Sequence, residues 1–157
     1  MNMEVFPPVE GSKEESKNII IEKGAWNAPL SKDIETDVVN KFFPEGQPSD
    51  LTVKALTFKE NSSNDEILNI DLQSKNDHSC DIRIVKSKLS GRMTVFCTDK
   101  KNGSFIFGHI PKEEISNLQK PAENLKLAIK TKTNLSGYAD DLFRLLVSKT
   151  EMQDGNR

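Results

Sequence analysis

Apolar residues alternate with polar ones along the middle of the chain, and this alternation predicts β-strands. The segments are 51–59, 66–73, 80–85 and the two halves of 92–110. A period of two places successive side chains on opposite faces of a sheet. In the first segment the apolar phase shifts between Ala55 and Leu56, which predicts a β-bulge. Polar, turn-rich loops between the segments favour an antiparallel meander.

The segment Arg92–Ile110 predicts a β-hairpin at the centre of the fold. Asn102-Gly103 separates two runs rich in aromatic and β-branched residues, and Asn and Gly tolerate the positive φ angles of a tight turn. Phe96 projects to the side opposite Cys97, so both faces of the hairpin carry apolar side chains. A strand that is apolar on both faces requires cover on both sides, and we therefore expect layers above and below this sheet.

Helical periodicity predicts two amphipathic helices. Ile34, Val38 and Phe42 repeat every four residues in the first helix, which Pro44 ends. Near the C-terminus a broad apolar stripe predicts a second helix over about 135–149.

The region between the hairpin and the second helix is expected to contain a short helix and a strand. The helix begins at Pro111 and is ended by Pro121. Residues 124–133 then alternate apolar side chains with lysines, which predicts an edge strand. A β-branched run within 18–22 predicts one further strand near the N-terminus.

Together these elements predict an α+β fold with a single, largely antiparallel sheet of about six or seven strands. One helix from the N-terminal half and one C-terminal helix are expected to cover its faces. We expect one domain over 18–150, which is long enough to bury a core without disulfides. Residues 1–17 are expected to form a flexible tail and residues 151–157 to fray.

Composition narrows the class of protein. The net charge of −2 argues against a dedicated polyanion binder. Cys80 and Cys97 have no CxxC spacing, which indicates free thiols packed as small apolar residues. The chain has no apolar run of membrane-spanning length and no secretion signal, so we expect a cytoplasmic or nuclear protein that does not enter a membrane.

No pattern of residues indicates catalysis. His78 lies in a polar loop and is expected to be solvated, whereas His109 falls among the phenylalanines of its strand and is expected to be partly buried. These histidines and the two cysteines are the ligand types of a zinc site, but their spacing is not that of a metal motif. Phosphate-binding glycine motifs are absent from the sequence. The sequence therefore predicts a chain that is not an enzyme, with no metal and no cofactor.

Contact with a partner is predicted at a tryptophan and at lysines. Trp26 lies in a Gly/Asn/Pro loop and is either an outlying core anchor or an exposed hot spot. The lysines flank the hairpin turn and the late strand, where they could meet an acidic protein surface or phosphates. The candidate partner-binding residues are Trp26, Lys100, Lys101, Lys126, Lys130 and Lys132.

We expect a non-catalytic protein–protein interaction module, a subunit or assembly factor of a larger complex. The order of elements resembles that of small proteasome-assembly chaperones, and also that of helix-grip proteins. The second resemblance implies a small apolar ligand held between a curved sheet and the C-terminal helix, in a cavity beneath Leu142, Phe143 and Leu146. Nucleic-acid binding ranks third, because the phenylalanines suited to base stacking are assigned to the core.

Overall fold

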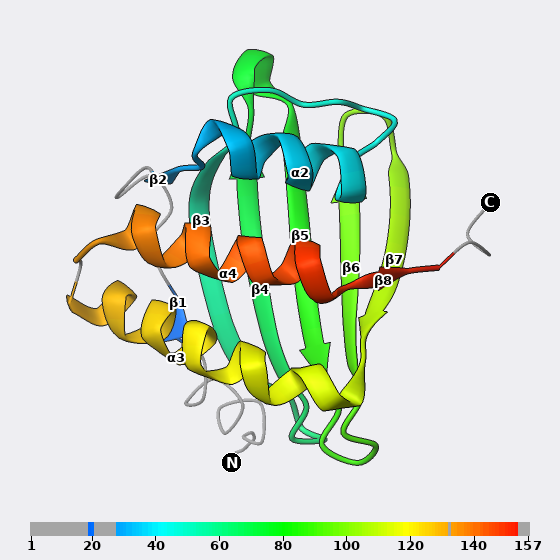
Figure 1. The fold of residues 1–157 in the computed structure, drawn as a ribbon, viewed down its shortest axis with the longest axis vertical. Coiled ribbons are helices and arrows are strands. Elements are labelled where there is room, and N and C mark those ends of the chain that lie inside the picture. The colour runs from blue at the N-terminus through cyan, green and yellow to red at the C-terminus, as the bar shows by residue number, and fades with distance from the viewer. Residues whose placement is uncertain (1–18, 21–27, 132, 154–157) are drawn as a thin grey trace, which may run out of the picture.

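The computed structural model describes residues 19–20, 28–131 and 133–153, and in these ranges eight strands form one antiparallel sheet (Figure 1). The strands follow the order β1-β3-β4-β5-β6-β7-β8, and β2 also pairs with β3. The α+β class and the single antiparallel sheet predicted from the sequence are confirmed. The predicted tail, Trp26 and Lys132 lie outside the described residues.

Five long strands form a meander, because each pairs with the strand that precedes it. Their bounds are β3 Thr52–Glu60, β4 Glu66–Gln73, β5 Ser79–Lys86, β6 Met93–Asp99 and β7 Ser104–Ile110. Strands β1 (Ile19–Ile20) and β2 (Ala28–Pro29) both pair with β3. The register of β3 shifts between Val53 and Ala55, which confirms a bulge in this strand, slightly before the predicted step from Ala55 to Leu56.

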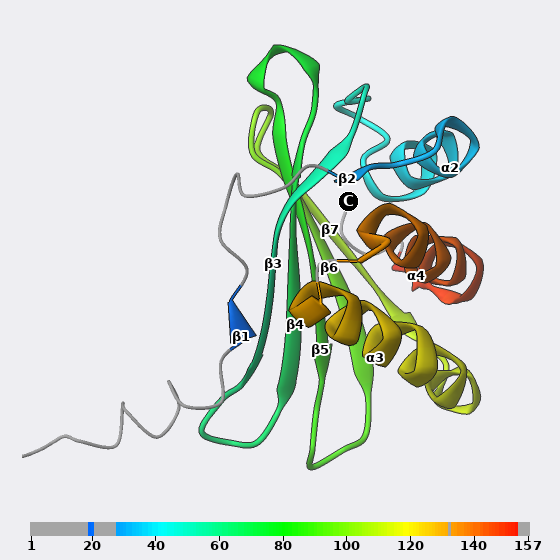
Figure 2. The same ribbon diagram turned by 90° about the vertical axis from the view of Figure 1, so that its left-hand side faces the viewer.

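Three α-helices are present in the described ranges, and all of them lie on one face of the sheet (Figure 2). Helix α4 (Leu135–Lys149) lies between α2 (Lys32–Phe42) and α3 (Ile115–Thr131). We call this the inner face and the opposite one the outer face. The prediction of layers above and below the hairpin is wrong, since the described residues place no helix on the outer face. None of the helices described is long and apolar enough to cross a membrane.

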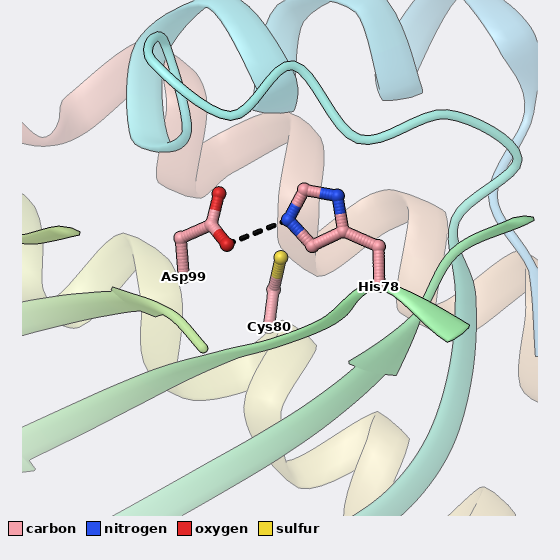
Figure 3. Close-up of side chains that lie close together, drawn as sticks. All are labelled: His78, Cys80 and Asp99. Atoms are coloured by element: carbon pink, nitrogen blue, oxygen red, sulfur yellow. Dashed lines mark hydrogen bonds and ion pairs between the residues drawn. The ribbon is translucent and has the colours of Figure 1, made fainter. Parts of the chain in front are cut away.

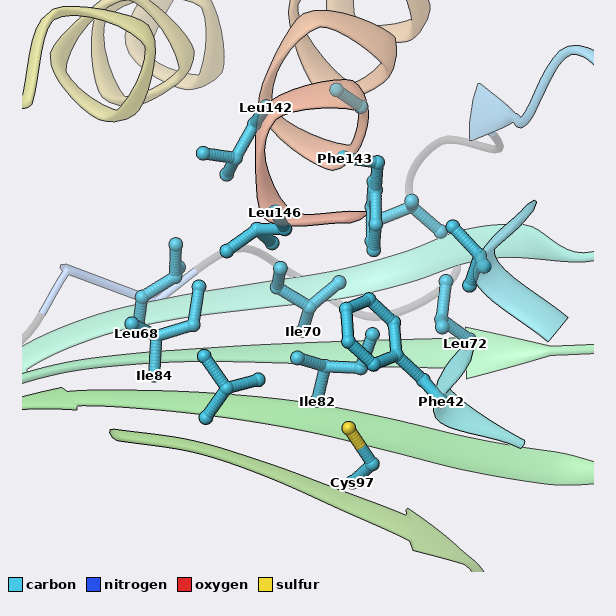
Figure 4. Close-up of a cluster of buried hydrophobic side chains, with 14 of the residues drawn as sticks. Phe42, Leu68, Ile70, Leu72, Ile82, Ile84, Cys97, Leu142, Phe143 and Leu146 are labelled. Atoms are coloured by element: carbon cyan, nitrogen blue, oxygen red, sulfur yellow. The ribbon is translucent and has the colours of Figure 1, made fainter. Parts of the chain in front are cut away.

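The core lies between the inner face and the helices. Ile70 and Ile82 are fully buried beneath Leu146, which α4 presents to the middle of the sheet (Figure 4). Phe42 reaches the same core from α2. The period-two alternation therefore selects one face of every long strand for burial, and the predicted stripe of α2 is confirmed.

Helix α3 contradicts two predictions, because it contains Pro121 and continues through the residues expected to form a strand. Leu118, Leu125 and Ala128 are buried at helical spacing, whereas Leu127 is 61% exposed. The alternation of apolar residues with lysines in this segment therefore does not reflect a strand, because the segment is helical. Packing of the buried side stabilises the helix despite the backbone hydrogen bond that Pro121 cannot donate.

The chain continues beyond α4 as β8 (Glu151–Met152), where the sequence predicted a frayed end. Met152 pairs with Gly108 and Glu151 with His109. A Cβ atom at Gly108 would lie 2.5 Å from the Glu151 carbonyl oxygen, so a glycine allows this close approach.

Candidate functional site

The outer face carries a group of rings on β6 and β7 that we name the outer aromatic cluster. Its members are Phe96, Phe105, Phe107 and His109. The ring centroids of Phe96 and Phe105 are 5.8 Å apart and stacked, and those of Phe96 and Phe107 are 6.2 Å apart. These rings partly cover one another, which accounts for an apolar outer surface without a helix above it.

A hollow of about 170 Å³ lies beside the outer aromatic cluster. It is lined by Asp81, Arg83, Phe96, Thr98 and Phe105. Phe105 is 52% exposed, and Arg83 is exposed on the neighbouring strand β5. The hollow therefore combines an aromatic wall with a cation, Arg83, and a carboxylate, Asp81. Aromatic and arginine side chains are enriched at protein interfaces.

The lysines predicted to bind a partner lie at two separate places in the described residues. Lys100 and Lys101 are in the β6–β7 turn, and the Lys100 Nζ atom is 3.9 Å from Asp81 Oδ2, at the rim of the hollow. Lys126 and Lys130 lie on α3 instead of a strand. The Lys126 Nζ atom is 5.7 Å from the centroid of the Phe58 ring. The partner-binding role of these residues stays a prediction.

His109 is half-buried, as the sequence predicted. Its Nε2 atom lies 2.6 Å from Nε2 of Gln153, which follows β8. The edge of its ring meets Phe107, with centroids 6.3 Å apart. His109 thus belongs to the packing of the outer face and of β8.

A cleft of about 350 Å³ lies on the inner side, between α3 and the adjacent ends of the long strands. Its apolar wall includes Phe58, Leu68, Ile84, Met93, Leu118, Leu142 and Leu146. Charged residues also line it, namely Lys59, Glu60, Glu66, Lys86, Glu123 and Lys126. Phe143 is buried in the core and does not line the cleft. The cleft is thus amphipathic. It overlaps only partly with the ligand cavity that the helix-grip resemblance implied, because Leu142 and Leu146 line it and Phe143 does not.

Three polar side chains are buried together at the other end of β5, and we name them the His-Cys-Asp cluster (Figure 3). Cys80 lies directly opposite Asp99 in the β5–β6 register, and the 3₁₀ turn η1 (Lys75–Asp77) brings His78 to them. The exposed fractions are 7% for His78, 1% for Cys80 and 0% for Asp99. One ligand atom from each residue lies within 4.8 Å of the other two.

The two oxygens of Asp99 have different surroundings. Oδ1 is 2.6 Å from His78 Nε2 and also accepts the backbone N–H groups of Lys101, at 3.1 Å, and Asn102, at 3.4 Å. It thereby holds the hairpin turn. Oδ2 is buried and has no hydrogen-bond partner among the described residues.

Cys80 is not activated as a nucleophile. Burial raises the pKa of its thiol to about 12, and the negative charge of Asp99 contributes to the increase. Burial raises the pKa of the Cys97 thiol as well. Because a thiolate is the reactive form, neither cysteine is suited to nucleophilic catalysis at neutral pH. Both are free and buried, as the sequence predicted.

Sequence reasoning missed two members of this cluster. His78 was predicted to be solvated, and that prediction is wrong, because the loop after β4 (which ends at Gln73) folds back to bury it. Asp99 was not considered as a candidate ligand. The signal was present, since the alternation that places Met93, Val95 and Cys97 on the inner face also places Asp99 there.

Comparisons with known proteins give no further assignment. The chain matches no protein-family model, and no significant match was found among curated proteins or among solved structures.

Proposed function

We propose that the chain is a non-catalytic binding protein that contacts a partner protein through its outer face, as a subunit or assembly factor of a larger complex. The observation that carries this proposal is the outer aromatic cluster, with Phe105 half-exposed beside Arg83. The raised pKa of Cys80 supports the absence of cysteine catalysis. Free cysteines also support a reducing compartment, the cytoplasm or the nucleus.

The chemistry of the hollow favours one kind of partner. Covering the Phe105 ring would remove apolar surface from water, at about 25 cal/mol per Å². Arg83 lines the hollow together with one carboxylate, Asp81, and Lys100 forms an ion pair with that carboxylate. A matching partner therefore presents an apolar side chain beside an acidic one, with the carboxylate facing Arg83.

The test compares purified complexes formed by the full chain and by two variants, Phe105→Ser and Arg83→Glu. Leu89→Ser is the matched control, because Leu89 is 97% exposed and does not line the hollow. We expect the wild type and the control to retain one partner protein in stoichiometric amount through size-exclusion chromatography. Each variant of the hollow is expected to reduce the retained partner at least about tenfold.

Two results would contradict this proposal. Equal retention of the partner by the wild type and by both variants of the hollow would place the contact elsewhere. A bound species that nuclease removes would assign the outer aromatic cluster to nucleic-acid bases, which stack on exposed aromatic rings.

The cleft favours a second candidate function, the binding of a small amphipathic ligand. Its volume of about 350 Å³ lies within the range of small-molecule sites, and its apolar wall is bordered by charged groups. We expect a fatty-acid probe to bind at one site per chain. Ala122→Trp, which fills the cleft, should abolish that binding, whereas Leu127→Trp on the exposed side of α3 should not. Equal binding to both variants would exclude the cleft.

A further inference from the structure

The His-Cys-Asp cluster brings three different metal-ligating groups together in the interior. His78 supplies an imidazole nitrogen, Cys80 a sulfur and Asp99 a carboxylate, and their ligand atoms lie within 4.8 Å of one another. All three side chains are more than nine-tenths buried. Water solvates a carboxylate on the surface, whereas the charge of a buried carboxylate must be compensated by a partner.

Hydrogen bonding accounts for only part of this arrangement. The contact of His78 with Asp99 Oδ1 and the two backbone N–H groups of the hairpin turn compensate one oxygen. Asp99 Oδ2 has no partner among the described residues, although it is buried. A buried acceptor without a hydrogen-bond partner destabilises the native state, and more so when it is charged. A cation bound by the cluster would neutralise the buried Asp99 carboxylate from the side of Oδ1, the oxygen that faces His78 (Figure 3).

The loop between α2 and β3 closes over the other oxygen, Oδ2, at Gly46. A Cβ atom at this position would lie 1.7 Å from Asp99 Oδ2 and 3.1 Å from His78 Cε1. Gly46 is therefore a position where a side chain would block the carboxylate and the imidazole together. In Figure 3 this loop, drawn in cyan, passes over the cluster, in which Cys80 of β5 and Asp99 of β6 are paired residues.

We infer that the His-Cys-Asp cluster binds a divalent transition-metal ion of the zinc type, with His78, Cys80 and Asp99 as its protein ligands. Nitrogen, sulfur and oxygen donors together suit Zn²⁺ and Co²⁺, whereas Ca²⁺ and Mg²⁺ prefer oxygen alone. Three protein ligands leave one position of a tetrahedral ion for water. The ion joins the start of β5 to the end of β6, and its binding stabilises the native chain.

The test uses the full chain and the metal alone. Co²⁺ added to the metal-free wild type is expected to give a thiolate-to-cobalt charge-transfer band that saturates at one equivalent. Excess Zn²⁺ is expected to remove the band and to raise the melting temperature, because the ion binds only the native state. X-ray absorption of the zinc form should show one sulfur among nitrogen and oxygen ligands.

Variants assign the ligands. Cys80→Ala is expected to lose the charge-transfer band. Asp99→Asn is expected to weaken Co²⁺ binding at least about tenfold, because even residues that only hydrogen-bond to a metal ligand contribute that much to metal affinity. Cys97→Ala is the matched control, because Cys97 is equally buried on the inner face but lies outside the cluster. It should retain the band at full intensity.

The inference is overturned by the wild type alone if no thiolate band and no change in melting temperature follow the addition of metal. It is also overturned if the zinc ligands contain no sulfur, or if the band is lost in Cys97→Ala and kept in Cys80→Ala. The wild-type measurements decide the question even if Cys80→Ala does not fold.

Discussion

Gly46, in the loop between α2 and β3, lies where a larger side chain would overlap the buried Asp99 carboxylate. The residue lies where the loop passes directly over the Asp99 carboxylate. Its neighbour Glu45 is exposed and has no such contact with the interior. Substitutions at these two adjacent residues therefore distinguish the effect of steric contact with Asp99 from the effect of altering the loop sequence.

Gly46→Ala is predicted to destabilise the native state by about 1–3 kcal/mol, because its Cβ would overlap the buried oxygen and force the loop or β6 to move. Urea denaturation of both variants measures this. Glu45→Ala should change the free energy of unfolding by less than about 0.5 kcal/mol, as an exposed surface substitution does. A Gly46→Ala variant as stable as the wild type would show that the loop does not close over Asp99.

At the scale of elements, α3 shows packing overriding local pattern. Leu125 and Leu127 are two residues apart and would share one face of a strand. In the helix they separate, since Leu125 is 1% exposed and Leu127 is 61% exposed.

Leu125→Ala is predicted to lower the free energy of unfolding by about 2–5 kcal/mol, because it leaves a cavity in the core. Leu127→Ala should leave the stability nearly unchanged, since alanine favours the helix and little buried surface is lost. Thermal or urea denaturation of the two variants provides the comparison. Similar losses for both leucines would favour the strand that the sequence predicted.

Strand β8 depends on the absence of a side chain at Gly108. The Cβ of Gly108→Ala would lie 2.5 Å from the Glu151 carbonyl oxygen and 2.9 Å from Met152 Sδ. We predict that this substitution costs about 1–3 kcal/mol in the full chain and much less in a chain ending at Thr150. A double-mutant cycle measures the difference. An equal cost in both chains would mean that β8 does not pack on Gly108.

At the scale of the molecule, surface carboxylates hold segments distant in sequence. Asp50 forms a hydrogen bond and ion pair with Lys32, and Lys32 lowers the pKa of that carboxyl. Asn117 and then Lys149 lower the pKa of Glu114, which links α3 and α4 through the preceding turn. A lowered pKa in the native state stabilises the protein above the ordinary pKa of the group.

Acidification is therefore predicted to destabilise the protein as these carboxylates become protonated. Urea denaturation over a series of pH values measures the slope, and Asp50→Asn with Glu114→Gln should flatten it. Asp50 is exposed and Glu114 is partly buried at the surface, so the effect is modest and salt should reduce it. A free energy of unfolding that increased as Asp50 and Glu114 became protonated would contradict their lowered pKa values.

The one-sided arrangement of helices also decides which surfaces are available to a partner. A sheet covered on both sides would have buried Phe96, Phe105 and Phe107 in a second core. With all described helices on the inner face, Phe105 is instead half-exposed beside Arg83. The proposed contact surface thus exists because of the topology, although its residues were visible in the sequence only as apparent core.

Local pattern determined most of the elements and the face to which each strand residue belongs. Alternation predicted the meander and the bulge, helical spacing predicted α2 and α4, and Asn102-Gly103 predicted the hairpin turn. The same alternation already placed Asp99 on the inner face. These features follow from backbone geometry over a few residues, which a sequence reports directly.

Only the tertiary structure decided which face the helices cover, whether 124–131 is helical, and which polar groups meet. The contact of His78 with Asp99 joins the loop before β5 to the end of β6, and both strands and their connection separate the two residues in sequence. The cleft beneath α3 likewise requires residues from the strands and both C-terminal helices. Such contacts depend on packing between elements distant in the chain, and no local periodicity encodes them.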